Sequence, residues 1–349
     1  MKSIDPKSPI LVTGASGYLA GWICKKLLEQ GYTVHAAIRN PEDVSKTQTL
    51  NKIAQNSSGQ IRWFKSDLLV ESSYLETMEG CELVFHTASP FINKVKNPQR
   101  DLIDPAVKGT SNVLRSANAS ASVKRVVLTS SVAAVMGDTK DLKTIDGGVA
   151  DETHWNFSSN IRHQAYSFSK TLAEKKAWEM VEQQSKWDLV VINPTLILGP
   201  GIQASASSES FKIMKQIGDG TAKWGAPGLD LALVDVRDVA DAHIKAGFNP
   251  SAKGRHIISA DHKTILEISR ILYQRYHNQY HLPKTELPKW VAWLVGPLFG
   301  LKRKMVSRNF GYPWLVNNQK SIDVLNLKYR PIETTIKEHF QQMIEEKMI

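Results

Sequence analysis

Three side chains in the middle of the sequence have the types and spacing needed to protonate a carbonyl oxygen during reduction by hydride. Tyr166 and Lys170 open a long helical pattern four residues apart, so both fall on one face of the helix. A tyrosine has a reference pKa near 10, and a neighbouring ammonium lowers it by favouring the phenolate. Ser131, with Ser130 as the nearer alternative, follows a strand-like run and could donate a hydrogen bond to the carbonyl oxygen. The set predicts a tyrosine proton donor, a lysine that activates it and a serine that holds the oxygen.

Spacing alone does not identify this pair, because Tyr280 and Lys284 are also four residues apart. Pro283 lies between them and would remove a helical hydrogen bond, so the two side chains would not share a helix face. We therefore assign the chemistry to Tyr166 and Lys170, and Lys170 could also hydrogen-bond the ribose of a nicotinamide cofactor.

A glycine turn near the N-terminus is typical of a dinucleotide pyrophosphate site. It separates a strand-like run at 10–13 from a helical pattern, so backbone N–H groups at the helix start can face a phosphate. Ala20 fills the third small position of the usual pattern and still allows close packing of helix and strand. The turn residues expected at the cofactor are Thr13, Gly14, Ser16 and Gly17.

Residues after the second and third strand-like runs decide which nucleotide fits. An acidic residue after the second run would bind the ribose 2′-hydroxyl of NAD, whereas Arg39 and the nearby Lys46 suit a 2′-phosphate and predict NADP(H). Glu42 and Asp43 are close enough to keep NAD open. Asp67, after the third run, could accept a hydrogen bond from the adenine amino group or cap the next turn.

Short apolar runs alternate with helical patterns through the first 200 residues, which predicts an α/β fold with a Rossmann-type doubly wound parallel sheet. The expected strands are 10–13, 33–38, 61–65, 83–86, 126–130 and 189–193, and the expected helices are 22–30, 102–119 and 167–184. The alternation loosens after Gly199 and Pro200. We therefore expect an NADP-binding domain at 1–200, to which some later segments return, and a smaller, mainly substrate-binding lobe at 201–349.

The basic charge of the chain is mostly scattered. There are 44 Lys and Arg against 34 Asp and Glu, a net charge of +10, and the densest basic run is 302–304. No nucleic-acid motif accompanies it, so we expect no nucleic-acid partner. The apolar stretch at 290–301 is 12 residues long and contains Gly296 and Pro297, too short for a bilayer span of about 20 residues. It could pack over the second lobe, form a subunit contact or lie on a membrane surface.

Two cysteines, Cys24 and Cys81, are too few for a disulfide framework, and the N-terminus does not resemble a secretory signal. Both observations predict a cytoplasmic protein. His86 and His243 have no cluster of metal-ligand spacing around them, so we expect no metal.

The segments 13–17, 67–68, 129–131 and 166–170, in this order, make the chain similar to an extended short-chain dehydrogenase/reductase. The segments 84–91, 126–131 and 193–200 further resemble the dihydroflavonol reductase branch, with its cinnamoyl-CoA reductases and yeast methylglyoxal and carbonyl reductases. The resemblance implies NADPH-dependent reduction of a ketone or aldehyde. By the same resemblance, further cofactor-binding residues are Tyr18, Leu19, Leu68, Thr87, Ala88, Ser89, Pro194, Thr195 and Leu196.

The expected partner is a small-molecule carbonyl compound held above the nicotinamide, where open α/β sheets bind ligands. Candidate pocket walls beside Ser131 are Phe91, Ile92, Met136, Trp155 and Trp224, each of which could instead be a core residue. The sequence leaves open whether the protein is a monomer or a homodimer.

Two other functions use part of the same machinery. An NAD-dependent nucleotide-sugar epimerase or dehydratase has the same Tyr-Lys pair, but it favours an acidic residue where Arg39 stands and a Val-Tyr-Gly after the serines. Residues 132–137 read Val-Ala-Ala-Val-Met-Gly instead. A regulator that binds NADP without turnover would commonly lose the tyrosine, which this chain keeps.

Overall fold

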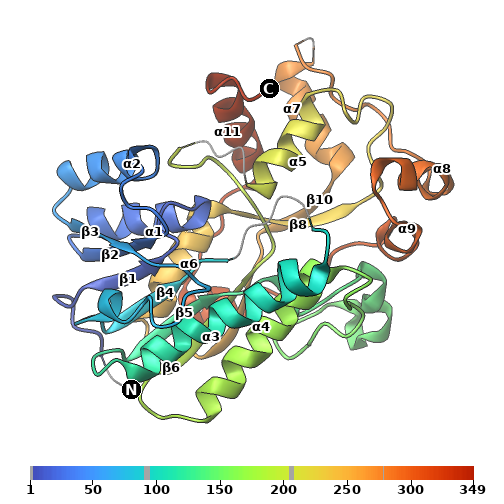
Figure 1. Ribbon diagram of the computed structural model, residues 1–349. Helices are drawn as coiled ribbons and strands as arrows, with labels where there is room; N and C mark the ends of the chain where they lie inside the picture. The colour runs from blue at the N-terminus through green and yellow to red at the C-terminus, as the bar shows by residue number, and fades with distance from the viewer. Residues whose placement is uncertain (1–2, 90–94, 204–207, 278) are drawn as a thin grey trace.

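A parallel sheet of seven strands forms the centre of the protein, in a computed structural model that describes residues 3–89, 95–203, 208–277 and 279–349. Its strand order is β3-β2-β1-β4-β5-β6-β9 (Figure 1). The strands are β1 (Ile10–Thr13), β2 (Thr33–Ile38), β3 (Gln60–Lys65), β4 (Leu83–His86), β5 (Arg125–Thr129), β6 (Asp188–Pro194) and β9 (Gly254–Ile258). The six strands expected from the sequence are confirmed to within one residue at each end, and the fold is the predicted Rossmann-type α/β fold.

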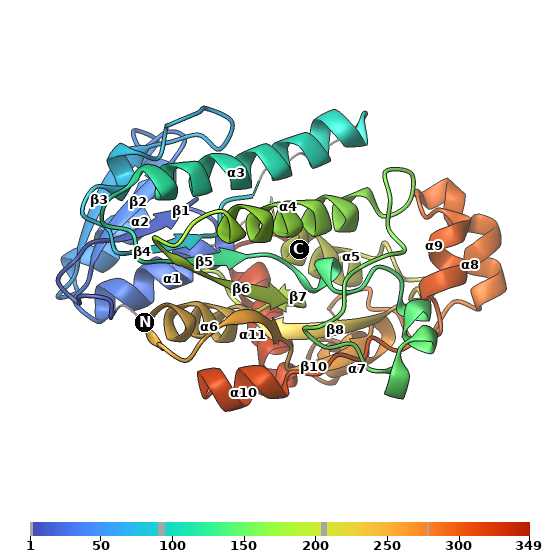
Figure 2. The same cartoon turned by 90° about the horizontal axis from the view of Figure 1, so that it is seen from below.

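Helices cover both faces of this sheet (Figures 1 and 2). One face carries α1 (Tyr18–Glu29), α2 (Val44–Gln55) and α6 (Val236–Phe248), and the other carries α3 (Asp104–Ala119) and α4 (Ala165–Glu182). In β1, Ile10 and Val12 belong to the core under α1 and α6, whereas Leu11 belongs to the core under α3 and α4. Successive strand side chains point to opposite faces, so a sheet covered on both sides needs continuous apolar runs.

A second, three-stranded sheet lies beyond the carboxyl end of β6. Its order is β10-β8-β7, with β8 parallel to β7 and antiparallel to β10. Its strands are β7 (Leu196–Leu198), β8 (Asp230–Asp235) and β10 (Asp261–Thr264), and the helices packed on it are α5 (Glu209–Gly218), α7 (Ile265–Tyr276) and α11 (Ile332–Glu345). Thr264 caps α7 through a reciprocal pair of hydrogen bonds with Glu267. This cap lets α7 begin directly at the end of β10.

The chain passes between the two sheets more than once. After β8, the chain returns to the large sheet with α6 and β9, and β9 pairs with β6. The next strand, β10, pairs with β8 in the small sheet. β9 is not predicted from the sequence, and Arg255 and His256 interrupt the apolar pattern there. Segments from both sides of residue 200 therefore share the large sheet. That residues 201–349 mainly bind the substrate stays a prediction.

The remaining helical segments are short. They are η1 (Glu76–Met78), η2 (Gln99–Ile103), η3 (Val132–Ala134), η4 (Thr139–Thr144), η5 (Asp146–Gly148), α8 (Lys289–Val295), η6 (Gly296–Phe299), α9 (Arg303–Asn309) and α10 (Gln319–Leu325). We call residues 289–309, which contain α8, η6 and α9, the α8–α9 hairpin. Across the described ranges, no helix is both long and apolar enough to cross a membrane.

Candidate active site

The turn between β1 and α1 has the backbone geometry of a phosphate site. Gly14 has φ +67°, and a Cβ added to it would lie 3.1 Å from the Cα of Ala88. Gly17 precedes α1 in extended backbone, and the first turn of this helix carries no acidic residue. The helix therefore offers N–H groups and the positive end of its dipole, with no side chain capping them. The predicted helix start at 22 is corrected to Tyr18, because Gly17 is the cap.

Thr13 joins the ends of β1 and β4. Its hydroxyl oxygen accepts hydrogen bonds from the backbone N–H groups of Thr87 (3.2 Å) and Ala88 (3.0 Å). The Thr87 hydroxyl in turn donates to the Thr13 carbonyl (2.5 Å), and the Nδ1 of His86 lies 3.0 Å from the Thr13 hydroxyl. Burial, with a smaller effect from the Lys170 charge, lowers the pKa of His86 to about 3, so its imidazole is neutral. These contacts fix the distance between the glycine turn and the segment that follows β4.

Two turn residues use their side chains for packing. Leu19 is 9% exposed and belongs to the core under α1, so only its backbone is free for a ligand. The Tyr18 hydroxyl donates to the Gly199 carbonyl (2.5 Å), and its ring meets Phe211 edge-on at 5.6 Å between centroids. Tyr18 therefore joins the phosphate turn to the second sheet, whereas the half-buried Ser16 lies in the turn itself.

Arg39 and Lys46 both reach solvent on the nucleotide side of the sheet. Arg39 directly follows β2, and Lys46 lies in the first turn of α2. Neither forms an ion pair with an acidic residue in the described ranges. Asp43, which had kept NAD open, caps α2 by accepting hydrogen bonds from the backbone N–H (3.0 Å) and hydroxyl (2.6 Å) of Ser45. Two exposed cations therefore lie beside the start of α2.

Asp67 and Leu68 form the turn after β3. One carboxylate oxygen of Asp67 accepts a hydrogen bond from the Leu69 N–H (2.8 Å), so the capping role left open by the sequence is present. Leu68 packs against Gly109 of α3, and its carbonyl accepts from the Asn112 side chain (2.8 Å). The second oxygen of Asp67 is not used by this cap.

Tyr166 and Lys170 lie one turn apart at the start of α4. Tyr166 is 53% exposed, and the Lys170 ammonium lies 5.9 Å from the centroid of its ring. The same ammonium donates a hydrogen bond to the Ser89 hydroxyl (3.2 Å), in the segment after β4. Lys170 thus links the proposed proton donor to the strand end that meets the glycine turn.

The two serines after β5 differ in what they bind. The Ser130 hydroxyl donates to the buried carboxylate of Glu174 (2.5 Å), so its proton is already used. The Ser131 oxygen accepts from the Ala133 N–H (3.1 Å) as the cap of η3, which leaves its proton to donate. Of the two alternatives, the geometry favours Ser131 as the donor to a carbonyl oxygen. The segment η3 packs directly against α4.

Glu174 is a residue of this site that the sequence analysis missed. Its side chain has no exposed surface, and it accepts hydrogen bonds from the Nε of Arg255 (2.6 Å) and the side-chain nitrogen of Asn193 (2.8 Å). The Asn193 nitrogen also donates to the Ser131 carbonyl (3.1 Å). The signal was present, because Glu174 continues the four-residue spacing from Tyr166 and Lys170 along one face of α4.

A small cavity of about 20 Å³ lies between α4 and the strand ends, large enough for about one water molecule. The residues lining it include Leu68, His86, Ala88, Ser89, Ser130, Lys170 and Glu174. The structure therefore brings four of the sequence-predicted cofactor residues, Leu68, Ala88, Ser89 and Lys170, to one cavity.

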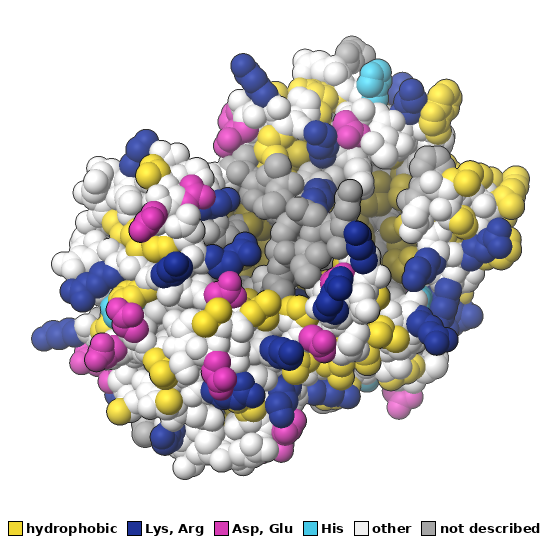
Figure 3. Space-filling model, in the orientation of Figure 1, with side chains coloured by type: hydrophobic (Ala, Val, Ile, Leu, Met, Phe, Trp, Pro, Cys, Tyr) yellow, Lys and Arg dark blue, Asp and Glu magenta, His cyan; other side chains and the backbone are white. Residues whose placement is uncertain are grey.

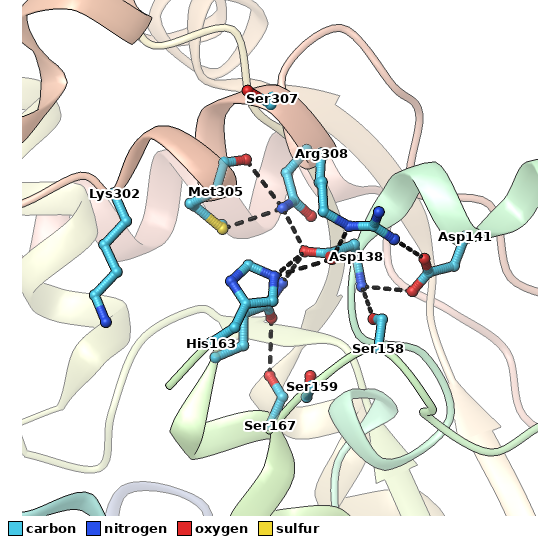
Figure 4. A network of polar contacts seen from close by, with 12 residues as sticks. Asp138, Asp141, Ser158, Ser159, His163, Ser167, Lys302, Met305, Ser307 and Arg308 are labelled. Carbon is cyan, nitrogen blue, oxygen red and sulfur yellow. Dashed lines mark hydrogen bonds and ion pairs between the residues drawn. The ribbon is translucent and has the colours of Figure 1, made fainter. Parts of the chain in front are cut away.

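A second polar network holds the backbone just before α4 (Figure 4). The fully buried Asp138 accepts hydrogen bonds from His163 (2.9 Å), Gln164 (2.5 Å) and Asn309 (2.8 Å), and it pairs with Arg308. Burial opposes ionisation, but the hydrogen bonds from Asn309, His163 and Arg308 outweigh it and lower the pKa of the Asp138 carboxyl. Gln164 has φ +52° and is the cap of α4, so this network sets the direction in which the helix starts.

The remaining predicted residues lie in different surroundings. Met136 is 2% exposed and packs in a core with Leu142, so its side chain does not reach a pocket surface. Trp155 lies 4.0 Å from the Arg255 guanidinium, whereas Trp224 is 83% exposed. Phe91 and Ile92 lie outside the described residues. Pro194 ends β6, Leu196 begins β7, and the backbone N–H of the buried Thr195 between them donates to the Ile258 carbonyl (3.0 Å).

A wider hollow of about 420 Å³ lies elsewhere, between Pro200, α7 and α11. Its residues include Arg237, which is paired with Asp235 and Glu338, and none of the predicted site residues. The larger volume therefore does not coincide with the Tyr166 and Lys170 pair.

Known proteins resemble this chain along nearly its whole length. The model of the NAD dependent epimerase/dehydratase family matches residues 10–259. A cinnamoyl-CoA reductase of Medicago truncatula is 38% identical over 350 residues, which cover 99% of this chain and 99% of that protein. A dihydroflavonol 4-reductase of Gerbera hybrida is 31% identical over 342 residues, which cover 96% of this chain and 90% of that protein.

Solved structures agree with this likeness. Vestitone reductase from alfalfa superimposes with a TM-score of 0.75 at 27% identity, covering 98% of this chain and 100% of that one. The yeast methylglyoxal/isovaleraldehyde reductase, solved in complex with NADPH, gives a TM-score of 0.76 at 26% identity, covering 97% and 99%.

Proposed function

Since the chain belongs to the NAD dependent epimerase/dehydratase family, as the sequence resemblance indicated, we propose that it is a reductase that uses NADPH to convert a ketone or aldehyde to an alcohol. The observation that carries the proposal is the position of the Lys170 ammonium, 5.9 Å from the Tyr166 ring centroid and 3.2 Å from the Ser89 hydroxyl. One cation thus serves both the proton donor and the strand end next to the cofactor turn.

The proposed reaction divides between the cofactor and three side chains. Bound NADPH would supply a hydride to the carbonyl carbon. Ser131 donates a hydrogen bond to the carbonyl oxygen, and its free hydroxyl proton makes this possible. Tyr166 then gives its hydroxyl proton to that oxygen, and the phenolate left behind is stabilised by Lys170. Water reprotonates Tyr166 from its exposed side.

The choice of NADP over NAD rests on Arg39 and Lys46. A 2′-phosphate carries extra negative charge, and both cations face solvent without a described acidic partner, whereas Asp43 is occupied as a helix cap. The glycine turn fits the pyrophosphate because Gly14 has φ +67° and a Cβ there would press on Ala88. Pro194, Thr195 and Leu196 would meet the nicotinamide.

Turnover of NADPH with a panel of carbonyl compounds tests the proposal. We expect NADPH absorbance to fall with one or more of small aldehydes, diketones and flavonoid-like ketones, the last of these because of the dihydroflavonol 4-reductase relatives. Tyr166→Phe should lower kcat by about 10²- to 10⁴-fold. Tyr280→Phe is the matched control, because it removes a hydroxyl from the other Tyr-x-x-x-Lys segment and should leave the rate unchanged.

The epimerase or dehydratase alternative predicts a different result. Such an enzyme would carry tightly bound NAD, convert a nucleotide sugar and show no preference for NADP. Equal rates for Tyr166→Phe and the unchanged protein would contradict both enzymes.

A further inference from the structure

The α8–α9 hairpin exposes large apolar side chains that the active site does not use. Trp290 is 71% exposed, Trp293 42%, Leu294 56% and Leu298 83%. Trp290, Trp293 and Leu294 fall on one side of α8 by their spacing of three and four residues. On the other side of the same helix, Ala292 is buried against Val306 and Phe310. The hairpin therefore packs its inner side on a small core shared with Phe310, Leu229 and Leu287, and it exposes its largest apolar side chains to water.

Basic side chains border these apolar groups, and no acidic residue accompanies them. Lys302, Arg303 and Lys304 are exposed, and Arg303 lies over the Trp293 ring at 4.4 Å from its centroid. No Asp or Glu occurs anywhere from 287 to 322. Figure 3 shows hydrophobic side chains and Lys or Arg side by side at the edge of the molecule where Figure 1 places α8 and α9.

The hairpin is fixed to the rest of the protein from its inner side. Arg308 pairs with Asp138 and Asp141, and the Lys302 ammonium donates to the Arg162 carbonyl (3.0 Å). Figure 4 shows Arg308 meeting Asp138 and Asp141. The exposed tryptophans thus lie on a hairpin that ion pairs and a hydrogen bond join to the rest of the protein.

We propose that the α8–α9 hairpin binds the surface of an anionic lipid membrane. Tryptophan prefers the boundary between headgroups and acyl chains, where Trp290 and Trp293 would lie with Leu294 and Leu298 beside them. Arg303 and Lys304 would meet the negative headgroups. This is a surface contact with no spanning segment, and it is independent of the reaction proposed above.

The charge pattern argues against a second copy of the chain as the occupant. A two-fold contact through the hairpin would bring the basic run at 302–304 of one copy towards the same surface of the other. Like charges across an interface are unfavourable, whereas an anionic lipid surface pairs with them.

Binding of the full chain to vesicles tests the proposal. We expect the protein to sediment with vesicles of phosphatidylcholine and phosphatidylserine, to bind phosphatidylcholine alone at least about tenfold more weakly, and to be released by salt near 1 M. Reversing two charges with Arg303→Glu and Lys304→Glu should weaken binding by at least about tenfold. Trp290→Ser with Leu298→Ser should do the same, because the apolar contact is lost.

Matched control variants show whether vesicle binding depends on the hairpin or only on the net charge and on any exposed apolar side chain. Lys52→Glu with Lys108→Glu changes the net charge equally on distant helices, and Trp224→Ser removes a tryptophan that is 83% exposed elsewhere. Both should bind vesicles like the unchanged protein, and the hairpin variants should keep their circular dichroism. Failure of the unchanged protein to bind, or equal losses in control and hairpin variants, would overturn the proposal. So would a dimer that the hairpin substitutions dissociate while vesicles remain unbound.

Discussion

Replacing Glu174 by glutamine tests how the buried carboxylate positions the active site. The carboxylate accepts four hydrogen bonds, from Arg255, Trp178, Ser130 and Asn193. A glutamine has one acceptor oxygen. If the glutamine NH₂ takes the place of the oxygen that faces Arg255, this NH₂ meets the donors of Arg255 and Trp178. If the NH₂ takes the place of the other oxygen, it faces the side-chain nitrogen of Asn193, which is also a donor. Glu174→Gln therefore loses at least one hydrogen bond in either orientation, and it removes the charge that compensates Arg255.

The expected cost follows from the burial of both partners. The side chains of Glu174 and Arg255 are 0% and 7% exposed, and removing one partner of such a pair costs about 3–5 kcal/mol. A chain of 349 residues has an unfolding entropy of about 0.7 kcal/mol per degree, so the melting temperature should fall by about 4–7 °C. Because Asn193 also holds the Ser131 carbonyl, kcat should fall about 10- to 100-fold with a smaller change in KM.

Thermal and urea unfolding with steady-state kinetics check both numbers. Glu182→Gln is the matched control, since it makes the same change at an exposed position on the same helix. In the double variant Glu174→Leu with Arg255→Leu, the loss of stability should be smaller than the sum of the two single losses, because neither charge is left unpaired. A Glu174→Gln protein as stable and as active as the unchanged one would refute the reasoning.

Three further predictions concern the cofactor turn and the buried histidines. Arg39→Asp should raise the KM for NADPH at least about tenfold and leave the KM for NADH equal or lower. An unchanged ratio of the two KM values would show that Arg39 does not bind the 2′-phosphate. Gly14→Ala should cost about 1–3 kcal/mol of stability and weaken NADPH binding, because φ is +67° and the new Cβ would lie 3.1 Å from Ala88; titration of the intrinsic fluorescence with NADPH measures the second effect. Burial lowers the pKa of His243 and of His256 to about 4, below the reference near 6.5, so the unfolded chain binds more protons between these values. The free energy of unfolding should therefore fall as the pH drops from 6.5 towards 4, by up to about 1.36 kcal/mol per pH unit for each histidine. Urea unfolding measures this free energy at pH 7 and at pH 5, and equal values at the two pH values would contradict the prediction.

Local signals in the sequence were enough to place six of the seven strands of the large sheet, and they carry the prediction of Tyr166 and Lys170 as the catalytic pair. The glycine turn and the Tyr166 to Lys170 spacing each lie within one short segment, so their geometry follows from the strand, turn or helix that contains them. The choice between Ser130 and Ser131 needed the structure, because it depends on which hydroxyl meets Glu174 across three elements. In the sequence, Glu174 resembles any charged residue of a helix, because its partner Arg255 lies in β9, far along the chain.

Side chains in loops were harder to place for a related reason. Met136 had the same apolar character as a pocket wall, but the packing of η3 and η4 around it makes it a core residue. Tyr18 stays a predicted cofactor residue, and its hydroxyl also donates to the Gly199 carbonyl, 181 residues away in sequence. Contacts between distant segments decide such roles, and residue type alone does not.

The return of the chain to the large sheet through β9 means that the protein cannot be divided into two independent modules. A fragment ending near residue 200 would lack β9, so β6 would become an unpaired edge strand of the kind that promotes aggregation. The same fragment would leave the Glu174 carboxylate buried without Arg255. Exchange of the second lobe between relatives should therefore succeed only when α6 and β9 stay with the large sheet, and a single cut at one linker should yield two pieces that fail to fold.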